Sequence, residues 1–532
     1  MKKWITATVF VMMLLCVGVP AANAQTTGDF RTHSFLNNGN WSSASSWDKY
    51  NGTVWSPASA APTGSETIYI MPGDTVNVDI AVTVTGTIND SGRVNIGSGT
   101  LTIGSGGIYN CAKDTGRIPT ATWETGSTCM VTGAATSAPS NANQDFYNFA
   151  WNSPKQSSNL NPGWNGNTIH GDVICTATGS SRLQFLAPKS DSTQSVTITG
   201  AIRVSGSGSL SSQGTSNARS TAIVYSYGSI IAKGGNFSVA RGSQGGTGTT
   251  TWYIYGDTLS LDSTTTQNSN PSGAKFVFAK SGVQDLILNK VIWGTGTTPV
   301  NITVDSGTTL NFGTSVLPTV NTGSFILLGH ATLQTANAGG IDSTIQCAGA
   351  SGGGNSFDTT ANYIFNGTSA QVTGTKMPAT VNDLTINNRA GVTLTQATTI
   401  NGVLHLKAGE FDNTIPFKLG PNGSISLEGG SLKVTAVKQT NSKIPLRFFV
   451  DQNYPNPFNP TTNITYGLPN SAHVTAKVYN ILGQEVATLF VGDQAAGVHT
   501  LQFDGSNLSS GVYLYRIDAG SSVDVKRMVL LK

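Results

Sequence analysis

Charged side chains are scarce in this chain of 532 residues. Asp, Glu, Lys and Arg make up 11% of it, against about a quarter in ordinary soluble domains. The formal net charge is only +3, which gives no strong field that would suit nucleic acid or an anionic membrane surface. Because apolar residues alternate regularly with polar ones, the low charge does not indicate disorder.

Long apolar runs are missing beyond the N-terminus. Residues 5–19 form a short apolar run that follows Lys2 and Lys3 and precedes the small-x-small sequence Ala22-Asn23-Ala24. This is the pattern of a secretory signal peptide over residues 1–24, and it predicts cleavage between Ala24 and Gln25. No later stretch reaches the roughly 18 apolar residues of a spanning helix, so we expect no transmembrane segment in the mature chain.

Cysteine and histidine are too sparse for the usual metal sites. After the signal peptide, four cysteines remain, without a Cys-x-x-Cys pair or a histidine at zinc spacing. The sequence therefore predicts neither a metal nor another cofactor. In an oxidising compartment Cys111 and Cys129 close the shortest loop and are the favoured disulfide, with buried free thiols as the alternative.

Paired catalytic groups are also missing. A glycoside hydrolase needs two carboxylates that face each other across the scissile bond. The nearest pairs are Asp74 with Asp79 and Asp257 with Asp262, and their odd spacing places the two members on opposite faces of a straight strand. The histidines are isolated and lack a nucleophile motif: His33, His170, His330 and His405. We expect no enzyme, with a polysaccharide lyase or glycoside hydrolase as the alternative.

Glycine and short alternating runs, in contrast, are abundant. From about residue 66 to residue 434, runs such as 66–70, 75–79 and 82–88 recur between Gly, Ser and Thr turns, and apolar residues at helical spacing are absent. Residues 283–289 (VQDLILN) echo residues 381–387 (VNDLTIN). The pattern predicts an all-β chain built on a right-handed parallel β-helix or solenoid, with tandem β-sandwiches as the alternative.

Tryptophans gather in residues 25–65, before this repetitive region. Trp41, Trp47 and Trp55 could stack on sugar rings, but a β-solenoid needs a cover over its first open edge, so we predict an N-terminal cap. A sugar-binding module remains the alternative, with exposed aromatics among Trp123, Trp151 and Trp164.

The C-terminal part has a different texture. Residues 435–447, with Lys438, Lys443 and Pro445, break the pattern and are expected to be a linker. Residues 448–532 then contain short period-two runs at 463–468, 473–481, 485–490, 498–504, 512–518 and 523–531. They predict a small antiparallel, immunoglobulin-like β-sandwich. Gly511 is expected to need a positive φ at the turn before the fifth run.

A proline-rich leader opens this last domain. Three prolines in six residues exclude helix and central strand, so the leader lies extended, with Tyr454 and Phe458 free to dock as anchors. The runs QNYPNPFNPTT, KVYNILGQEV, LSSGVYLYRI and KRMVLLK together resemble the type A C-terminal sorting domain of the type IX secretion system. The residues that carry the resemblance are Asn453, Tyr454, Pro455, Asn456, Pro457, Phe458, Asn459, Pro460, Gly483, Gly511, Tyr513, Lys526 and Arg527.

The resemblance implies a destination for the chain and leaves the role of residues 66–434 open. It implies passage through the periplasm, export across the outer membrane by the type IX machinery, and release or attachment at the cell surface. The anchor would be a surface polysaccharide or lipopolysaccharide. The solenoid resembles the passenger regions of secreted bacterial adhesins in texture, so we expect a non-catalytic role in adhesion or surface structure.

Overall fold

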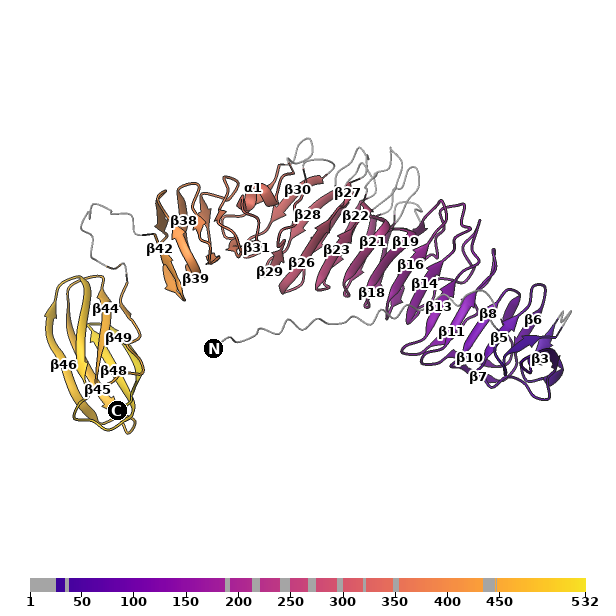
Figure 1. Ribbon diagram of the computed structural model, residues 1–532, viewed down its shortest axis with the longest axis horizontal. Helices are drawn as coiled ribbons and strands as arrows, with labels where there is room; N and C mark the ends of the chain where they lie inside the picture. Colours follow the sequence, from indigo (N-terminus) through magenta and orange to yellow (C-terminus); the bar gives the residue numbers. More distant parts are fainter. Residues whose placement is uncertain are drawn as a thin grey trace. The chain divides into compact units, whose positions relative to one another are not determined.

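Short strands separated by tight turns form nearly the whole chain (Figure 1). The computed structural model describes residues 25–532 apart from 34–37, 187–191, 213–220, 240–248, 267–273, 294–299, 319–321, 348–353, 434–444 and 446. The chain divides into two compact units, Met1–Lys433 and Val434–Lys532. The predicted signal peptide and most of the predicted linker lie outside the described residues.

The first unit is a β-solenoid of about 13 turns. A long ladder of parallel strands runs through it from the first turns to the last. In order these strands are β5 (Thr67–Ile70), β8 (Thr87–Asp90), β11 (Ile108–Cys111), β13 (Thr128–Val131), β14 (Asn148–Asn152), β16 (Val173–Ala177), β19 (Ile202–Ser211), β21 (Ile230–Ser238), β23 (Thr258–Asp262), β26 (Gly282–Asn289), β29 (Thr308–Asn311), β31 (Thr332–Thr335), β33 (Asn362–Phe365), β36 (Leu384–Asn387), β39 (Val403–Asp412) and β41 (Ser424–Leu427). Sandwiches are built from antiparallel sheets, so this ladder confirms the solenoid over the tandem sandwiches.

Shorter ladders form the other faces of the solenoid. One has eight strands: β15 (Thr168–Ile169), β18 (Thr193–Ile198), β20 (Thr221–Ser226), β22 (Thr250–Ile254), β25 (Ala274–Phe278), β28 (Val300–Val304), β30 (Thr322–Leu327) and β32 (Ser356–Phe357). Three have three strands each: β2 (Gly39–Asn40), β6 (Thr75–Val78) and β9 (Arg93–Ile96); β7 (Ala81–Val84), β10 (Thr100–Ile103) and β12 (Thr122–Trp123); and β35 (Thr380–Val381), β38 (Thr398–Ile400) and β40 (Phe417–Leu419). Six brief strands pair in parallel with strands of the long ladder or with one another: β17 (Leu183–Gln184), β24 (Thr265–Thr266), β27 (Ile292–Trp293), β34 (Gln371–Val372), β37 (Val392–Thr393) and β42 (Gly430–Leu432). The single α-helix among the described residues, α1 (Gly340–Thr344), lies in a connection.

Alternation along each strand decides which side chains enter the interior. In β20, Ala222, Val224 and Ser226 are buried, whereas Ile223 and Tyr225 point outward and are half-buried. Inward side chains of successive turns stack, so one continuous core runs from Phe30 to Phe411. Aromatic rings in edge, tilted or stacked contact fill its middle, in the order Trp123, Phe146, Phe149, Trp164, Phe185 and Trp252.

Glycines make the sharp corners where one face of the solenoid gives way to the next. Residues 82–88 were expected to form one strand, but the structure breaks them into β7 and β8 at Gly86. A Cβ atom at Gly86 would lie 2.2 Å from the carbonyl oxygen of Glu66, so only glycine allows the chain to approach the previous turn there. Alternation alone does not reveal such a corner.

The first turn is covered by a small antiparallel flap. It consists of β1 (Phe30–Thr32), β3 (Trp47–Tyr50) and β4 (Trp55–Pro57), with the 3-10 helix η1 (Ala44–Ser46) before β3. Strand β1 pairs in parallel with β5 and so continues the long ladder outward. Trp41 and Trp47 are buried in edge-to-face contact with ring centroids 5.2 Å apart, so their rings lie in the core and are not exposed.

The second unit contains two antiparallel sheets around its own core. One holds β43 (Phe449–Val450), β44 (Thr461–Leu468) and β47 (Gly497–Asp504), and the other has the order β46 (Glu485–Gln494), β45 (Ala472–Asn480), β48 (Gly511–Ala519) and β49 (Ser522–Leu530). Buried residues of both sheets, among them Ile464 and Tyr466 from β44 and Val474 and Val478 from β45, form one cluster. This is the predicted small β-sandwich, and all six predicted strands are present.

No helix among the described residues has the length and apolar character that crossing a membrane requires.

Candidate functional site

The proline-rich leader lies along the last strand of the chain, β49. Gln452 Nε2 donates a hydrogen bond to the carbonyl oxygen of Arg527 at 2.7 Å, and Asn456 Nδ2 reaches the same oxygen at 3.5 Å. Asn456 Oδ1 accepts a hydrogen bond from the backbone N–H of Val529 at 2.9 Å. The first and the last motif of the domain therefore form one structural element.

Phe458 fastens the leader into the sandwich. Its backbone N–H donates to the carbonyl of Val529 and its own carbonyl accepts from the N–H of Leu531, both at 2.9 Å. Its ring is 1% exposed and lies 5.8 Å from the ring of Phe503. Of the two side chains expected to dock as anchors, Phe458 docks into the core of its own domain.

The rest of the leader presents a polar, proline-stiffened surface. Tyr454 is 81% exposed, and the peptide bonds Tyr454–Pro455 and Asn456–Pro457 are cis. Pro455, Pro457 and Asn459 are exposed as well, while the carbonyl of Pro460 accepts a hydrogen bond from Gly505 at 2.9 Å. The exposed side chains that another molecule could recognise thus lie on a backbone segment that is hydrogen-bonded to the sandwich.

A buried hydrogen-bond network holds the start of the leader. Asn453 is 1% exposed, and its backbone N–H donates to the hydroxyl of Tyr515 at 2.9 Å. That hydroxyl donates in turn to the carbonyl of Asp451 at 2.7 Å. Asn453 Nδ2 donates to Thr462 Oγ1 at 3.0 Å and to the carbonyl of Pro455 at 3.1 Å. Burial raises the pKa of Tyr515 to about 12, so its hydroxyl stays a donor at neutral pH.

The two glycines of the sorting motif differ in their backbone. Gly483 has φ +78° in the turn between β45 and β46, a conformation that favours glycine. Gly511 does not have a positive φ, and a Cβ atom there would meet nothing nearer than the Ser509 carbonyl at 3.9 Å. The expectation of a positive φ at Gly511 is wrong because this residue already belongs to β48, where it pairs with Leu530.

The remaining motif residues support the same two strands. The Tyr513 hydroxyl donates to the Ser509 carbonyl at 2.8 Å, which tightens the turn that leads into β48. Lys526 Nζ lies 3.7 Å from Asp524 Oδ2, and the Arg527 side chain is exposed while its carbonyl holds the leader.

The carboxylates of the solenoid that the sequence singled out do not converge. Asp74 is buried and accepts a hydrogen bond from the hydroxyl of Thr32, whereas Asp79 accepts one from the backbone of Ser42 at 3.0 Å. Asp257 forms an ion pair with Lys280, and Asp262 accepts from Asn289 Nδ2 at 2.9 Å. Each carboxylate therefore has a structural partner of its own.

A third acidic pair was not recognised in the sequence. Glu410 and Asp412 stand two residues apart in β39, hence on one face, and line a cavity of about 190 Å³ with Arg389. Hydrogen bonds from Lys433 and Thr414 lower the pKa of Asp412 to about 2. A glycosidase needs one carboxyl group with a raised pKa as its acid, so Asp412 does not suit that task.

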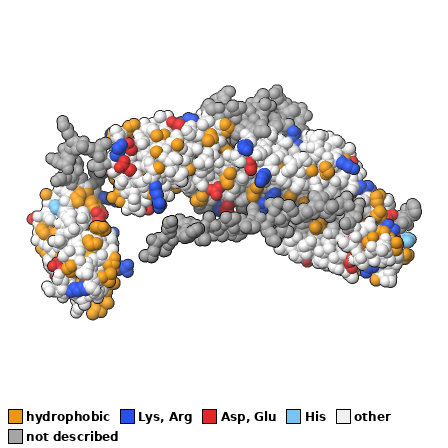
Figure 2. Space-filling model, in the orientation of Figure 1, with side chains coloured by type: hydrophobic (Ala, Val, Ile, Leu, Met, Phe, Trp, Pro, Cys, Tyr) orange, Lys and Arg blue, Asp and Glu red, His pale blue; other side chains and the backbone are white. Residues whose placement is uncertain are grey.

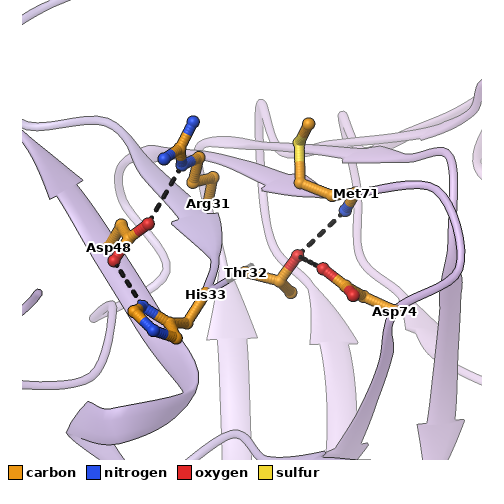
Figure 3. Close-up of polar contacts among 6 residues, drawn as sticks. All are labelled: Arg31, Thr32, His33, Asp48, Met71 and Asp74. Carbon is orange, nitrogen blue, oxygen red and sulfur yellow. Dashed lines mark hydrogen bonds and ion pairs between the residues drawn. The ribbon is translucent and has the colours of Figure 1, made fainter. Parts of the chain in front are cut away.

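Polar contacts at the start of the chain tie the cap to the first turn (Figure 3). Asp48 accepts from Arg31 Nε at 3.1 Å and lies 2.7 Å from His33 Nδ1. The Thr32 hydroxyl bonds to Asp74 and accepts from the N–H of Met71 at 3.0 Å. In a catalytic triad the hydroxyl is hydrogen-bonded to the histidine. Here it is directed to Asp74 instead, so the cluster is structural.

The tryptophans considered for sugar binding are mostly inside the solenoid. Trp151 and Trp164 are 0% exposed, and their indole nitrogens donate to Gln156 Oε1 at 2.8 Å and to the Ala142 carbonyl at 3.0 Å. The expectation that they are exposed is wrong, since inward positions of a wide core favour large aromatic rings. Trp123 is half-buried against the same core. Trp55 is also half-buried, and Arg31 Cζ lies over its ring, 4.8 Å from the ring centroid.

The predicted disulfide is not formed. Cys111 and Cys129 are buried, unbonded thiols, and the register places Cys129 opposite Tyr109 and Cys111 opposite Val131. The Cα atoms of two residues on neighbouring strands, offset by two positions along the strand, lie about 8 Å apart, which is beyond the reach of a disulfide. Burial raises the pKa of Cys111 to about 12. The alternative of buried free thiols describes this pair.

Histidines and charges are dispersed over the surface. His170 and His330 are exposed, and His405 Nδ1 lies 2.8 Å from Glu428 Oε1. Among the described residues no three His, Cys, Asp or Glu side chains gather as metal ligands would. Figure 2 shows charged side chains only as scattered spots on the face that it displays.

The comparisons with known proteins concern the last domain. Residues 452–531 match the family described as the secretion system C-terminal sorting domain. No curated protein and no solved structure matches the chain. The matched region spans the leader, the turn at Gly483 and strand β49, which the hydrogen bonds above join into one fold. Residues 452–531 are thus a type IX secretion C-terminal sorting domain.

Proposed function

We propose that this protein is a cell-surface β-solenoid that reaches the outside by type IX secretion and serves there in adhesion or surface structure without catalysis. The sorting domain implies secretion and attachment at the surface. The observation that carries the proposal is the fastening of the leader to β49 through Phe458, Asn456 and Arg527, since it presents the matched motifs as one recognisable surface.

Export by this route has two steps. The sequence of residues 1–24 supplies a signal for passage into the periplasm, with cleavage before Gln25. The sorting domain then engages the secretion machinery at the outer membrane, and a polysaccharide or lipopolysaccharide of the surface serves as the anchor. The exposed residues Tyr454, Pro455 and Asn459 are the side chains that we assign to contact with the machinery.

The adhesive role rests on the character of the solenoid. Its turns repeat an outward surface that is rich in Ser, Thr and Asn and poor in charge, which suits contact with extended, repetitive partners. Asp74 and Asp257 are held by Thr32 and Lys280 instead of facing another carboxylate, and the pKa of Asp412 is low where a catalytic acid needs it high.

Surface protease accessibility tests the export step. In a bacterium with a type IX system, the full chain should be cleaved by protease added to intact cells. A chain that lacks residues 448–532 should be protected until the outer membrane is opened. Full surface display of the shortened chain would contradict the proposal.

Incubation of the purified protein with polysaccharides tests the absence of catalysis, because new reducing or unsaturated ends would show an enzyme.

A further inference from the structure

Two pairs of stacked tyrosines stand on the outer face of the eight-stranded ladder. Tyr225 at the end of β20 and Tyr253 in β22 have ring centroids 5.5 Å apart and planes 15° apart. Just beyond them, Tyr227 and Tyr255 have centroids 4.8 Å apart and planes 13° apart. We define these four residues as the tyrosine platform.

A local repeat of the sequence produces the platform. Tyr225-Ser226-Tyr227-Gly228 recurs one turn later as Tyr253-Ile254-Tyr255-Gly256. Ser226 and Ile254 point inward and are buried, so the tyrosines of each run point outward on one face. The outward positions and the spacing of neighbouring turns together force the rings into stacked pairs.

Glycines hold the two runs close together. A Cβ atom at Gly228 would lie 2.1 Å from the Gly200 carbonyl oxygen, and one at Gly256 would lie 2.2 Å from that of Gly228. The N–H of Tyr227 donates to the carbonyl of Ile198 at 2.9 Å, and the N–H of Tyr255 donates to the carbonyl of Ser226 at 2.7 Å. These hydrogen bonds continue the ladder past the ends of the strands. The rings therefore stand on a rigid backbone, and little order has to be gained when a ligand binds.

Shorter side chains flank the platform on both sides. In register, Thr197 lies beside Tyr225, and Val277 lies beside Tyr253 on the opposite side. Ala279 continues the second flank next to Tyr255. Val277 is itself buried, Tyr225, Tyr253 and Tyr255 are half-buried, and Tyr227 is 50% exposed. The exposed part of the platform is therefore centred on Tyr227.

Three charged side chains lie near the platform: Asp257, Lys280 and Asp305. Asp257 follows the second run directly and forms an ion pair with Lys280 from the next turn. Burial, then the neighbouring hydroxyls of Tyr227, Tyr225 and Tyr253, raise the pKa of Tyr255. The hydroxyl of Tyr255 therefore stays protonated at neutral pH and can act as both donor and acceptor.

We infer that the tyrosine platform binds a neutral polysaccharide. Aromatic faces contact the apolar C–H face of a sugar ring, while hydroxyls and a nearby ion pair satisfy the sugar hydroxyls at its rim. An anionic polymer would find no complementary field here, because Asp257 and Lys280 neutralise each other and Asp305 adds a negative charge. The inference rests on the adhesive role proposed above and specifies the class of ligand that this role requires.

Electrophoresis of the purified full chain through gels containing a polysaccharide tests the inference. The neutral probes are a soluble β-glucan, a xylan and a galactomannan, and polygalacturonate is the charged comparison. Tyr227→Ala with Tyr255→Ala removes the exposed pair, and Tyr227→Phe with Tyr255→Phe keeps the rings. Val498→Ala is the control, since it removes an exposed side chain from the other unit.

We expect at least one neutral polysaccharide to retard the wild type. The double alanine variant should bind about tenfold more weakly or worse, as the loss of two ring contacts predicts. The phenylalanine variant and Val498→Ala should bind within a few-fold of wild type. If the double alanine variant does not keep the wild-type circular dichroism and melting curve, Tyr227→Ala alone serves, because that ring is half exposed.

Three results would overturn the inference. They are no retardation of the wild type by any neutral probe, equal retardation of the alanine variant, and self-association of the wild type that the alanine variant loses. The last would assign the platform to contact with a second copy. Surface display of the same variants is measured separately. Intact display with no binding rejects the ligand alone, whereas lost display of the wild type rejects the export proposal and leaves the binding result standing.

Discussion

Asp90 is the most deeply buried carboxylate for which a raised pKa is resolved. It stands at the end of β8 with 3% exposure, accepts a hydrogen bond from the Tyr109 hydroxyl, and accepts another from the N–H of Gly92 at 3.0 Å. Burial raises its pKa above the usual value of an aspartate, although these hydrogen bonds act in the opposite direction. The solenoid therefore carries a carboxylate whose charge is unfavourable in the folded state.

The substitution Asp90→Asn should have an effect that depends on pH. Since the pKa is raised by folding, the folded protein binds more protons than the unfolded chain above about pH 4, and stability is lost as pH rises through the folded pKa. The introduced amide keeps an acceptor for Tyr109 and does not titrate. The melting temperature of the variant, relative to wild type, should therefore be higher at pH 7 than at pH 4. A difference that is the same at both pH values would show that Asp90 does not titrate in this way.

At the residue scale, the sequence predicts local conformation better than it predicts which side chains become buried. The leader was correctly expected to be extended, yet Tyr454 and Phe458 look equivalent in the sequence while one is 81% and the other 1% exposed. Their difference arises from strand β49, which the chain adds only at its end. Trp151 and Trp164 were likewise assigned to the surface because nothing local shows how wide the core is.

At the scale of the element, the stack depends on close contact between successive corners. Gly228→Ala would place a methyl group 2.1 Å from the Gly200 carbonyl, so one turn must move away from the next. We expect a loss of about 1–3 kcal/mol, the usual cost of overpacking, seen as a lower melting temperature of the solenoid. The matched control is Gly354→Ala, where a Cβ atom would meet nothing within 4 Å. Equal melting of the two variants would contradict this account of the corners.

The pairing of the leader with β49 gives a second prediction at this scale. Phe458→Ala removes a buried ring from the sandwich, which should destabilise this unit by about 3–5 kcal/mol and abolish surface display. Tyr454→Ala removes an exposed ring and should leave the stability of the sandwich unchanged. Urea unfolding of the isolated domain and protease accessibility on cells provide the two readouts. Normal display of Phe458→Ala would show that the fastened leader is not what the machinery requires.

Elements were the part of the structure that the sequence predicted best, because alternation is a local property. Six of the seven strands of the sandwich follow from it within one or two residues, apart from β46, which runs on to Gln494, and the short strand β43 was not expected. Alternation fails at the corner of Gly86, where an unbroken apolar pattern passes from one face of the solenoid to the next. The length of one turn is visible in the recurring Tyr-x-Tyr-Gly run, but imperfect repeats elsewhere conceal it.

At the scale of the whole molecule, the chain contains two cores with no residue in common. One extends from Phe30 to Phe411 through the solenoid, and the other from Val450 to Leu530 through the sandwich. The division falls between Lys433 and Val434, close to the linker predicted at residues 435–447. The pattern of alternating runs changes near this boundary because the two units bury their side chains differently. The solenoid buries them between stacked turns, whereas the sandwich buries them between two facing sheets.

Separate cores predict separate folding. A chain that ends after Lys433 keeps the whole solenoid core, and the fragment 448–532 keeps the whole sandwich core, so each should fold alone. Calorimetry of the full chain should show two transitions, and each fragment should reproduce one of them at the same temperature. A fragment without a cooperative transition, or with a clearly lower melting temperature than in the full chain, would show that the units stabilise each other. Independent folding also suits the role of the last domain, because a sorting signal that shares no core with its passenger can direct it without being part of its structure.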